Sequence, residues 1–118
     1  SVNQSYYSDF TNEIKNFISY CVDQKKMLRY IGSMVADIHR TICLGGVFMY
    51  PSTSKNISGK LRMLYECNPL SFIVEQAGGV SINEQNERIL DIEISELHQR
   101  SPIIIGSKKL VDKAASFR

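Results

Sequence analysis

The residue types best suited to chemistry lie in one stretch, from Arg29 to Pro69. On a β-strand, Lys60 and Arg62 would place two positive charges on the same face. Arginine can hold a phosphate through two parallel hydrogen bonds, and lysine adds a compact charge. Tyr30 and Tyr50 would supply hydroxyl donors without further charge. These residues favour a site for a phosphorylated small molecule. A solvated strand face beside two tyrosines at the edge of the core is the open alternative.

Two further residues are candidates for ligand contacts beside this group. Glu66 lies at the expected junction of a strand and a helix, and carboxylates are typical Mg²⁺ ligands. The next acid, Glu75, falls inside the following helix, so Glu66 has no partner, and a surface charge is the alternative. Gly32 lies at the start of an expected helix, where free backbone N–H groups would favour an anion and glycine would permit its close approach.

These residues must be positioned by alternating helices and strands. Apolar residues recur with helical spacing from Phe10 to Val22, and Ser8, Asp9 or Thr11 is available as the N-cap. The expected helices are 10–22, 32–44, 68–77 and 108–115, and the expected strands are 47–50, 60–65, 80–82, 89–92 and 102–105. This order predicts an α/β fold in which a layered, mixed β-sheet is flanked by helices. Ligands then collect where strands end and helices begin.

For two of the helices the sequence predicts further details, namely the buried face of the second helix and the first residues of the third. The buried stripe of the second helix is expected to be Ile31, Met34, Val35, Ile38 and Ile42. Asp37 and Arg40 fall on other faces of this helix, close enough to pair. The third helix is expected to begin with Asn68 as N-cap and Pro69 at its first position.

Composition excludes several classes of protein. The hydrophobic fraction of 43% and the charged fraction of 22% are those of an ordinary globular domain. A net charge of +2 does not favour nucleic acid, and no apolar run is long enough to cross a membrane. The three cysteines (Cys21, Cys43 and Cys67) are expected to be buried free thiols in a reducing cytoplasm. His39 and His98 have no second ligand at metal-binding spacing.

Several motifs together resemble those of a known enzyme family. They are RYIGSMVADIHR, GGVFMYP, GKLRMLYECNP, EQAGG, ILD and LHQR, in this order and spacing. From SVNQ at its start to the GS before the last expected helix, the sequence is similar to the C-terminal half of class I fructose-1,6-bisphosphatases. The resemblance implies the fold of that C-terminal domain over residues 1–118, and a cytoplasmic homotetramer of gluconeogenesis. It also implies Mg²⁺-dependent hydrolysis of the 1-phosphate of fructose 1,6-bisphosphate, which gives fructose 6-phosphate.

The resemblance also implies roles for individual residues. The 6-phosphate ligands would be Asn3, Tyr6, Tyr30, Tyr50 and Lys60, with Arg62 as a further substrate-binding cation. Arg29 would reach the pocket of a neighbouring subunit, although the preceding segment DQKKML is shorter than is usual in the family. Met34 would contact the sugar through its backbone, and Glu66 would bind metal near the 1-phosphate.

The chain is expected to be one part of such an enzyme. Ser1 to Gln4 has the pattern of the end of a strand, which favours a start inside a larger protein. The family's N-terminal half carries most of the metal-binding acids, so we expect this piece alone to be inactive. Two alternatives stay open: a stand-alone phosphosugar-binding module, and a structural or oligomerisation domain in which these residues are surface.

Overall fold

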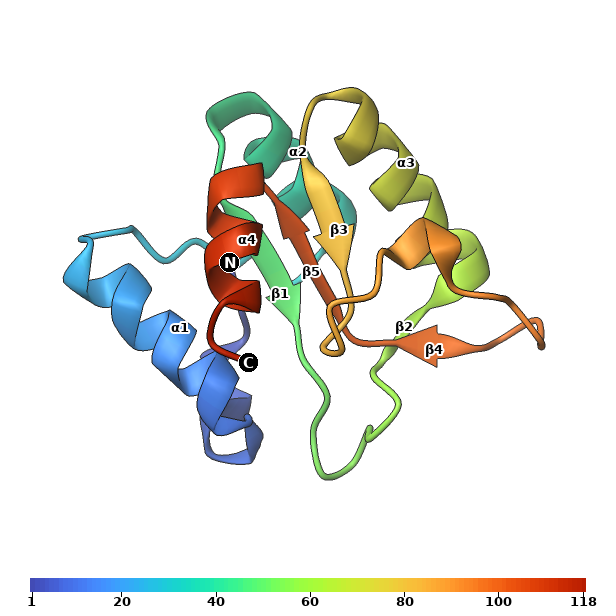
Figure 1. Ribbon diagram of the computed structural model, residues 1–118, viewed down its shortest axis with the longest axis horizontal. Coiled ribbons are helices and arrows are strands. Elements are labelled where there is room, and N and C mark those ends of the chain that lie inside the picture. Colours follow the sequence, from blue (N-terminus) through green and yellow to red (C-terminus); the bar gives the residue numbers. More distant parts are fainter.

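Three short strands form the centre of the computed structural model, which describes residues 1–118 (Figure 1). Their order is β1 (Val47–Tyr50), β5 (Ile103–Gly106) and β3 (Val80–Ile82), and β5 is antiparallel to both neighbours. A second sheet pairs β2 (Leu61–Arg62) with β4 (Arg100–Ser101), again antiparallel. The structure confirms the α/β class. The strand directions differ from those of the mixed sheet that was expected. All pairings between strands are antiparallel, and no two strands are parallel neighbours.

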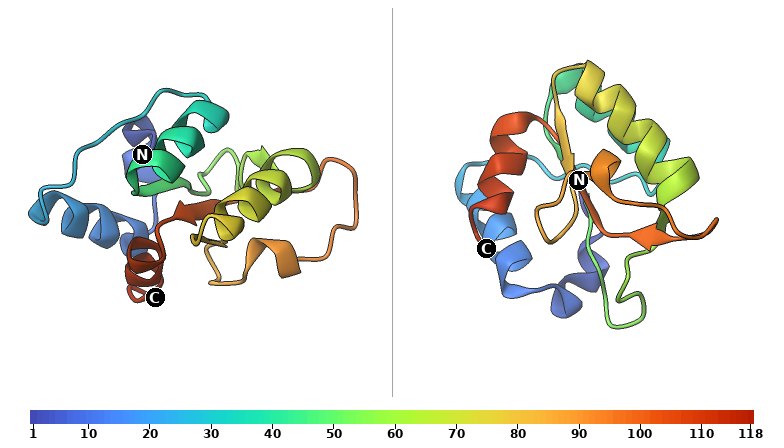
Figure 2. Two further views of the ribbon diagram at one scale, coloured as in Figure 1. Left: turned by 90° about the horizontal axis from the view of Figure 1, so that it is seen from above. Right: turned by 45° about the vertical axis from the view of Figure 1, so that its right-hand side comes forward.

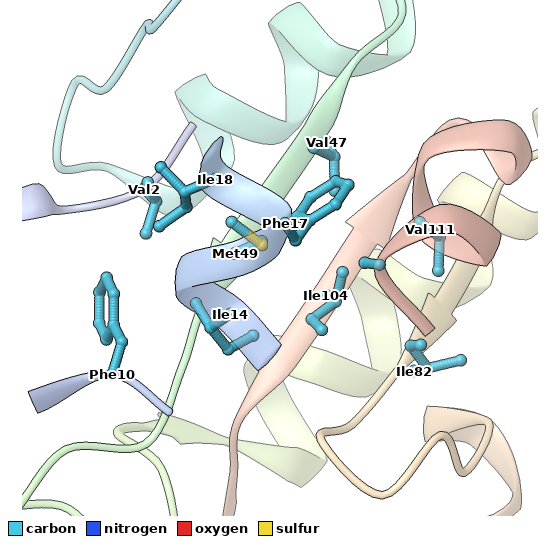
Figure 3. Packing of buried hydrophobic residues seen from close by; sticks show 11 residues of the cluster. Val2, Phe10, Ile14, Phe17, Ile18, Val47, Met49, Ile82, Ile104 and Val111 are labelled. Atoms are coloured by element: carbon cyan, nitrogen blue, oxygen red, sulfur yellow. The ribbon is translucent and has the colours of Figure 1, made fainter. Parts of the chain in front are cut away.

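Helices cover both faces of the central sheet, as the turned view of Figure 2 shows. On one face lie α1 (Asn12–Asp23) and α4 (Lys108–Ala115), and on the other α2 (Met34–Leu44) and α3 (Asn68–Gln76). Side chains of a strand alternate between the faces. Met49 and Ile104 therefore enter the cluster under α1 and α4 (Figure 3), whereas Phe48 enters the cluster under α2 and α3. All of β5 is buried because both its faces are covered.

Most of the predicted elements are present close to their predicted bounds. The first helix begins after Thr11, whose hydroxyl accepts a hydrogen bond from the Ile14 N–H at 3.4 Å. Strands β1 and β3 and helix α4 have the predicted bounds. Ser1 extends alongside β1, where its carbonyl accepts from the Met49 N–H at 2.8 Å. Residues 4–9 form a 3-10 helix (Gln4–Asp9). No helix is both long and apolar enough to cross a membrane.

Two predicted strands were wrong. The strand expected at 60–65 ends at Arg62, and Met63–Cys67 winds into a π-helical turn that runs directly into α3. Asn68 therefore has helical dihedral angles (φ −64°, ψ −51°) and makes no N-cap bond, contrary to expectation. Residues 89–92 contain a 3-10 helix, Ile89–Asp91, because only an isolated bridge between Ile82 and Arg88 pairs this segment with β3.

The buried face of α2 also differs from the prediction. Ile31, Val35 and Ile42 are exposed, whereas Asp37 and Thr41 are buried beside Ile38. Helix α2 starts at Met34, two residues later than expected, and Asp37 turns inward because its carboxylate has five hydrogen-bonding contacts there. The cysteines differ too: all are free, but only Cys67 is buried, and Cys43 is exposed.

Candidate functional site

Four of the predicted phosphate-binding residues lie together at the end of β1. The Lys60 ammonium is 5.8 Å from the centre of the Tyr50 ring, a cation–π arrangement. Burial raises the pKa of the nearby Tyr30 hydroxyl, and Tyr50 raises it further, while Asn3 and Lys60 act in the opposite direction. Tyr30 thus lies within electrostatic reach of the other three. One cation, two hydroxyls and one amide are suited to bind a phosphate.

The other residues that were predicted to bind substrate differ in how close they lie to this group. Met34, at the start of α2, packs with Tyr30 and Tyr50 against the core under α2 and α3. Tyr6 lies in the 3-10 helix at the N-terminus and packs against the core on the other face of the sheet. Arg29 is exposed and donates to the Leu28 carbonyl at 3.2 Å, so the structure does not bring it to Lys60.

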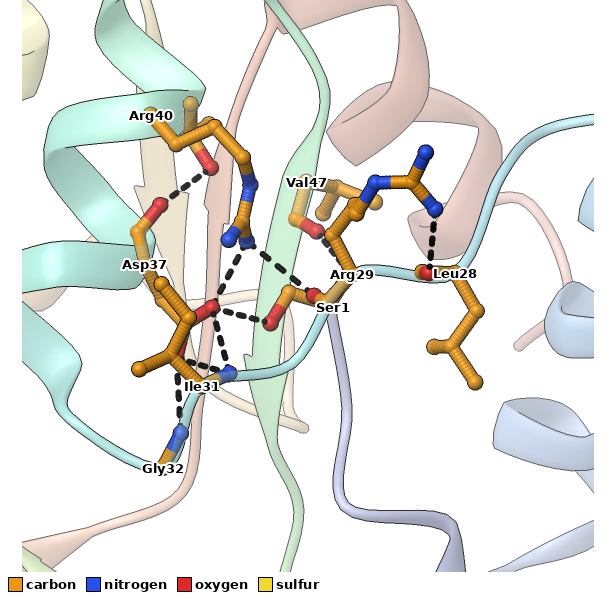
Figure 4. Close-up of polar contacts among 9 residues, drawn as sticks. Ser1, Leu28, Arg29, Ile31, Gly32, Asp37, Arg40 and Val47 are labelled. Carbon is orange, nitrogen blue, oxygen red and sulfur yellow. Dashed lines mark hydrogen bonds and ion pairs between the residues drawn. The ribbon is translucent and has the colours of Figure 1, made fainter.

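Tyr30 is positioned by Asp37, whose carboxylate lies wholly buried at the start of α2 (Figure 4). It accepts hydrogen bonds from the backbone N–H groups of Ile31 (3.2 Å) and Gly32 (3.3 Å). It also accepts from the Arg40 guanidinium at 2.7 Å, which confirms the predicted pair, and from the Ser1 hydroxyl at 3.0 Å. This fixes the backbone turn that follows Tyr30.

The same contacts correct the expected role of Gly32. Its N–H is bound by Asp37 and is not free for an anion. The glycine is needed for the turn, since its φ of +92° is left-handed. Burial raises the pKa of Asp37, but the bonds from Arg40, Ser1, Ile31 and Gly32 outweigh that effect and leave it lowered. Asp37 is therefore ionised at neutral pH.

Two residues that were predicted for separate roles, Arg62 for substrate binding and Glu66 for metal binding, contact each other. Alternation on β2 holds, since Leu61 is buried, Arg62 is half-buried and Lys60, just before the strand, is exposed. The Glu66 carboxylate accepts from the Arg62 backbone N–H at 3.0 Å and lies 3.6 Å from its guanidinium. The π-helical turn brings Glu66 back over Arg62. One nitrogen of Arg62, Nε, is buried without a hydrogen-bond partner.

Glu66 does not form a metal site with other residues of this chain. No three side chains of His, Cys, Asp or Glu gather at any point in residues 1–118. Magnesium usually needs one or two carboxylates together with phosphate and water ligands. The residues present therefore fit a single ligand to such an ion, and they do not fit a complete site.

Two residues that position the site were missed by sequence reasoning. Asp37 was assigned to an outer face, although an acid in the first turn of a helix is a signal for contacts with free N–H groups. Glu84 is also buried and accepts from the backbone N–H of Ser52 at 3.2 Å and from its hydroxyl. It anchors the loop between Tyr50 and Lys60. No local pattern signals this contact, because 32 residues separate the partners.

Comparison with known proteins identifies the family of this chain. The family model described as "Fructose-1-6-bisphosphatase, C-terminal domain" matches residues 1–118. The chain belongs to this family. A class 1 fructose-1,6-bisphosphatase of Cytophaga hutchinsonii is 54% identical over 123 aligned positions, which cover 99% of this chain.

Solved fructose-1,6-bisphosphatases have the same fold. The Leishmania major enzyme in its T-state matches 99% of this chain with a TM-score of 0.93 and 46% identity. Its holo form matches the whole chain with a TM-score of 0.91 and 44% identity. The chain spans 35% of the curated Cytophaga relative and 37–39% of these two solved chains.

Proposed function

We propose that this chain is the part of a fructose-1,6-bisphosphatase that binds the sugar and its 6-phosphate. The observation that carries the proposal is the Lys60–Tyr50 pair, at 5.8 Å, with Tyr30 and Asn3 beside it. The whole enzyme would hydrolyse the 1-phosphate of fructose 1,6-bisphosphate and release fructose 6-phosphate and phosphate in gluconeogenesis. The family membership and the geometry of the group both support this assignment.

Each residue has a defined part in the proposed site. Lys60 supplies the positive charge opposite the 6-phosphate, and the hydroxyls of Tyr30 and Tyr50 donate hydrogen bonds to its oxygens. Asn3 and Tyr6 would complete this shell from the N-terminal segment. Met34 would contact the sugar through its backbone. Arg62 would add a second cation beside Lys60, and Arg29 would act in the pocket of a neighbouring subunit.

Glu66 would contribute one carboxylate to Mg²⁺ near the 1-phosphate. When bound, Mg²⁺ would neutralise negative charge on the phosphoryl group and on the departing sugar oxygen and would activate the attacking water. The other ligands would come from outside these residues, since no three metal-binding side chains gather at any point in residues 1–118. A cytoplasmic homotetramer is the proposed assembly of the whole enzyme.

Calorimetric titration with fructose 6-phosphate in the absence of metal tests the phosphate site. Lys60→Ala should weaken binding by about 1.5–3 kcal/mol, the value for a hydrogen bond to a charged group. Lys55→Ala is the matched control, because Lys55 is an exposed lysine of the same loop and should leave binding unchanged. Circular dichroism first establishes that each variant is folded. Equal affinities of the chain and Lys60→Ala would reject the site.

The second function that the same group permits is phosphosugar binding without catalysis. The single carboxylate at Glu66 favours it for the isolated chain, which we predict releases no phosphate from fructose 1,6-bisphosphate with Mg²⁺. The measurement is phosphate release by the purified 118-residue chain beside Glu66→Ala. Metal-dependent release that disappears in the variant would show that the chain is catalytic by itself.

A further inference from the structure

Helix α2 carries two side chains of metal-binding types, His39 and Cys43, that the phosphate site does not use. Their contact corrects the expectation that His39 has no second ligand at metal-binding spacing. His39 and Cys43 are one helical turn apart, and both are exposed to solvent. The Cys43 Sγ lies 3.7 Å from the His39 Nε2, and neither side chain has another hydrogen-bond partner. The two donor atoms therefore lie close together on an exposed part of α2.

Their separation matches that of two ligands on one tetrahedral metal ion. Zinc bonds are about 2.3 Å to thiolate sulfur and about 2.0–2.1 Å to imidazole nitrogen. At a tetrahedral angle these lengths place sulfur and nitrogen about 3.6 Å apart. The observed 3.7 Å differs from that value by less than the usual tolerance of about 0.2 Å on ligand distances. The spacing of the two side chains on the helix thus suits a shared metal, toward which the imidazole ring would turn its Nε2.

Cys43 is also the cysteine best suited to bind a metal. A thiol must lose its proton to become a ligand, and burial opposes this. Burial raises the pKa of the Cys67 thiol to about 12 and also raises that of the half-buried Cys21. Cys43 is the only exposed cysteine of the three, and it alone has a histidine one turn away.

We propose that His39 and Cys43 form a two-residue chelate for a borderline-soft divalent ion of the Zn²⁺ type. Binding would replace the thiol proton, which passes to solvent, by a metal–sulfur bond, while the neutral imidazole binds through Nε2. No third side chain stands at the site, so water fills the two remaining positions of the metal. The site is independent of the proposed phosphatase activity and lies on a different residue pair from Glu66.

Cobalt(II) titration of the purified chain tests this directly, because cobalt replaces zinc and reports a thiolate ligand by a near-ultraviolet charge-transfer band. We expect the band in the unmodified chain and its displacement by Zn²⁺. Either His39→Ala or Cys43→Ser should weaken binding by about tenfold or more, since loss of even an outer partner costs 10–100-fold in affinity. Cys21→Ser is the matched control and should keep the band.

A second measurement gives the site an independent readout. Zn²⁺ should slow alkylation of Cys43 by iodoacetamide, followed by mass spectrometry, and His39→Ala should abolish that protection. A band that disappears in both variants supports the chelate, whether one chain or two bind each ion. Absence of a thiolate band, a band that forms with unchanged affinity in His39→Ala, or its loss in Cys21→Ser would overturn it.

Discussion

At the scale of single residues, one buried carboxylate connects the N-terminal segment, the turn after Tyr30 and helix α2. Asp37 is fully buried, and Ser1, Ile31, Gly32 and Arg40 all donate to it. A buried charge is costly unless it is paired and hydrogen-bonded, and here both conditions are met. Removal of the charge leaves those donors without their strongest acceptor, so Asp37 should matter for stability although it touches no ligand.

Asp37→Asn is predicted to lower the free energy of unfolding by roughly 3 kcal/mol, because Arg40 loses its buried partner. Urea denaturation measures the change. Asp112→Asn is the matched control: Asp112 also pairs with a cation on its own helix, Lys108, but both side chains are more than half exposed. That variant should change stability by less than about 0.5 kcal/mol. Equal effects of the two substitutions would contradict the role given to Asp37.

The lowered pKa of Asp37 predicts that the stability of the folded chain depends on pH. The pKa of Asp37 is lower in the folded chain than its ordinary value of 3.8. Its contribution is therefore fully present above that value and is lost as the pH falls through the lower, folded pKa. Urea midpoints measured between pH 6 and pH 2 should fall less steeply for Asp37→Asn than for the unmodified chain. Parallel curves would show that Asp37 does not titrate as described.

At the scale of elements, residue patterns predicted the helices well where the core is apolar. Helix α1 follows the spacing from Phe10 to Ile18 because only apolar contacts decide its orientation. Helix α2 does not, because the polar contacts of Asp37 outweigh the exposure of Val35. The π-helical turn at Met63–Cys67 was not predicted, since the alternation from Lys60 to Met63 is that of a strand.

The candidate site was also predicted only in part. Lys60, Tyr50, Tyr30 and Asn3 were predicted from residue type and from the family resemblance, and they lie together. The contacts that hold them were not predicted, because Glu84 and Ser52 are distant in sequence. Sequence patterns thus predicted which residues group together better than the contacts that support them.

At the end of β5 the backbone of Gly106 packs so closely against that of Gly46 that a side chain at position 106 should destabilise the fold. A Cβ atom on Gly106 would lie 2.2 Å from the Gly46 carbonyl oxygen, and the φ of Gly106 is +152°. Gly78 also has positive φ (+90°), but a Cβ there would meet nothing. Gly78→Ala should cost about 1–2 kcal/mol of stability from backbone strain alone. Gly106→Ala should cost about 1–3 kcal/mol more from overpacking, and thermal unfolding of the two variants compares them.

At the scale of the whole molecule, the outer faces of the helices remain partly apolar. Leu44 is 80% exposed and Val35 68% exposed on α2, and Phe72 and Ile73 are exposed on α3. Large exposed apolar patches are typical of surfaces that bind other protein surfaces. The 118-residue chain is therefore expected to associate in solution.

Apolar dye binding and sedimentation measure this expectation. The chain should enhance the fluorescence of an apolar dye and should sediment as species larger than a monomer at high concentration. A double variant, Val35→Gln with Leu44→Gln, should reduce both effects because it removes two of the most exposed apolar side chains. A strictly monomeric chain that binds no dye would contradict the prediction.

The most direct test of the central claim is to map where fructose 6-phosphate binds. Amide chemical shifts of the isotopically labelled chain would be followed by NMR during titration with this ligand, and with fructose as the control. The account predicts shifts centred on Asn3, Tyr30, Tyr50 and Lys60 with fructose 6-phosphate, and much weaker ones with fructose. Shifts centred elsewhere, or equal responses to both sugars, would contradict a 6-phosphate site formed by these residues.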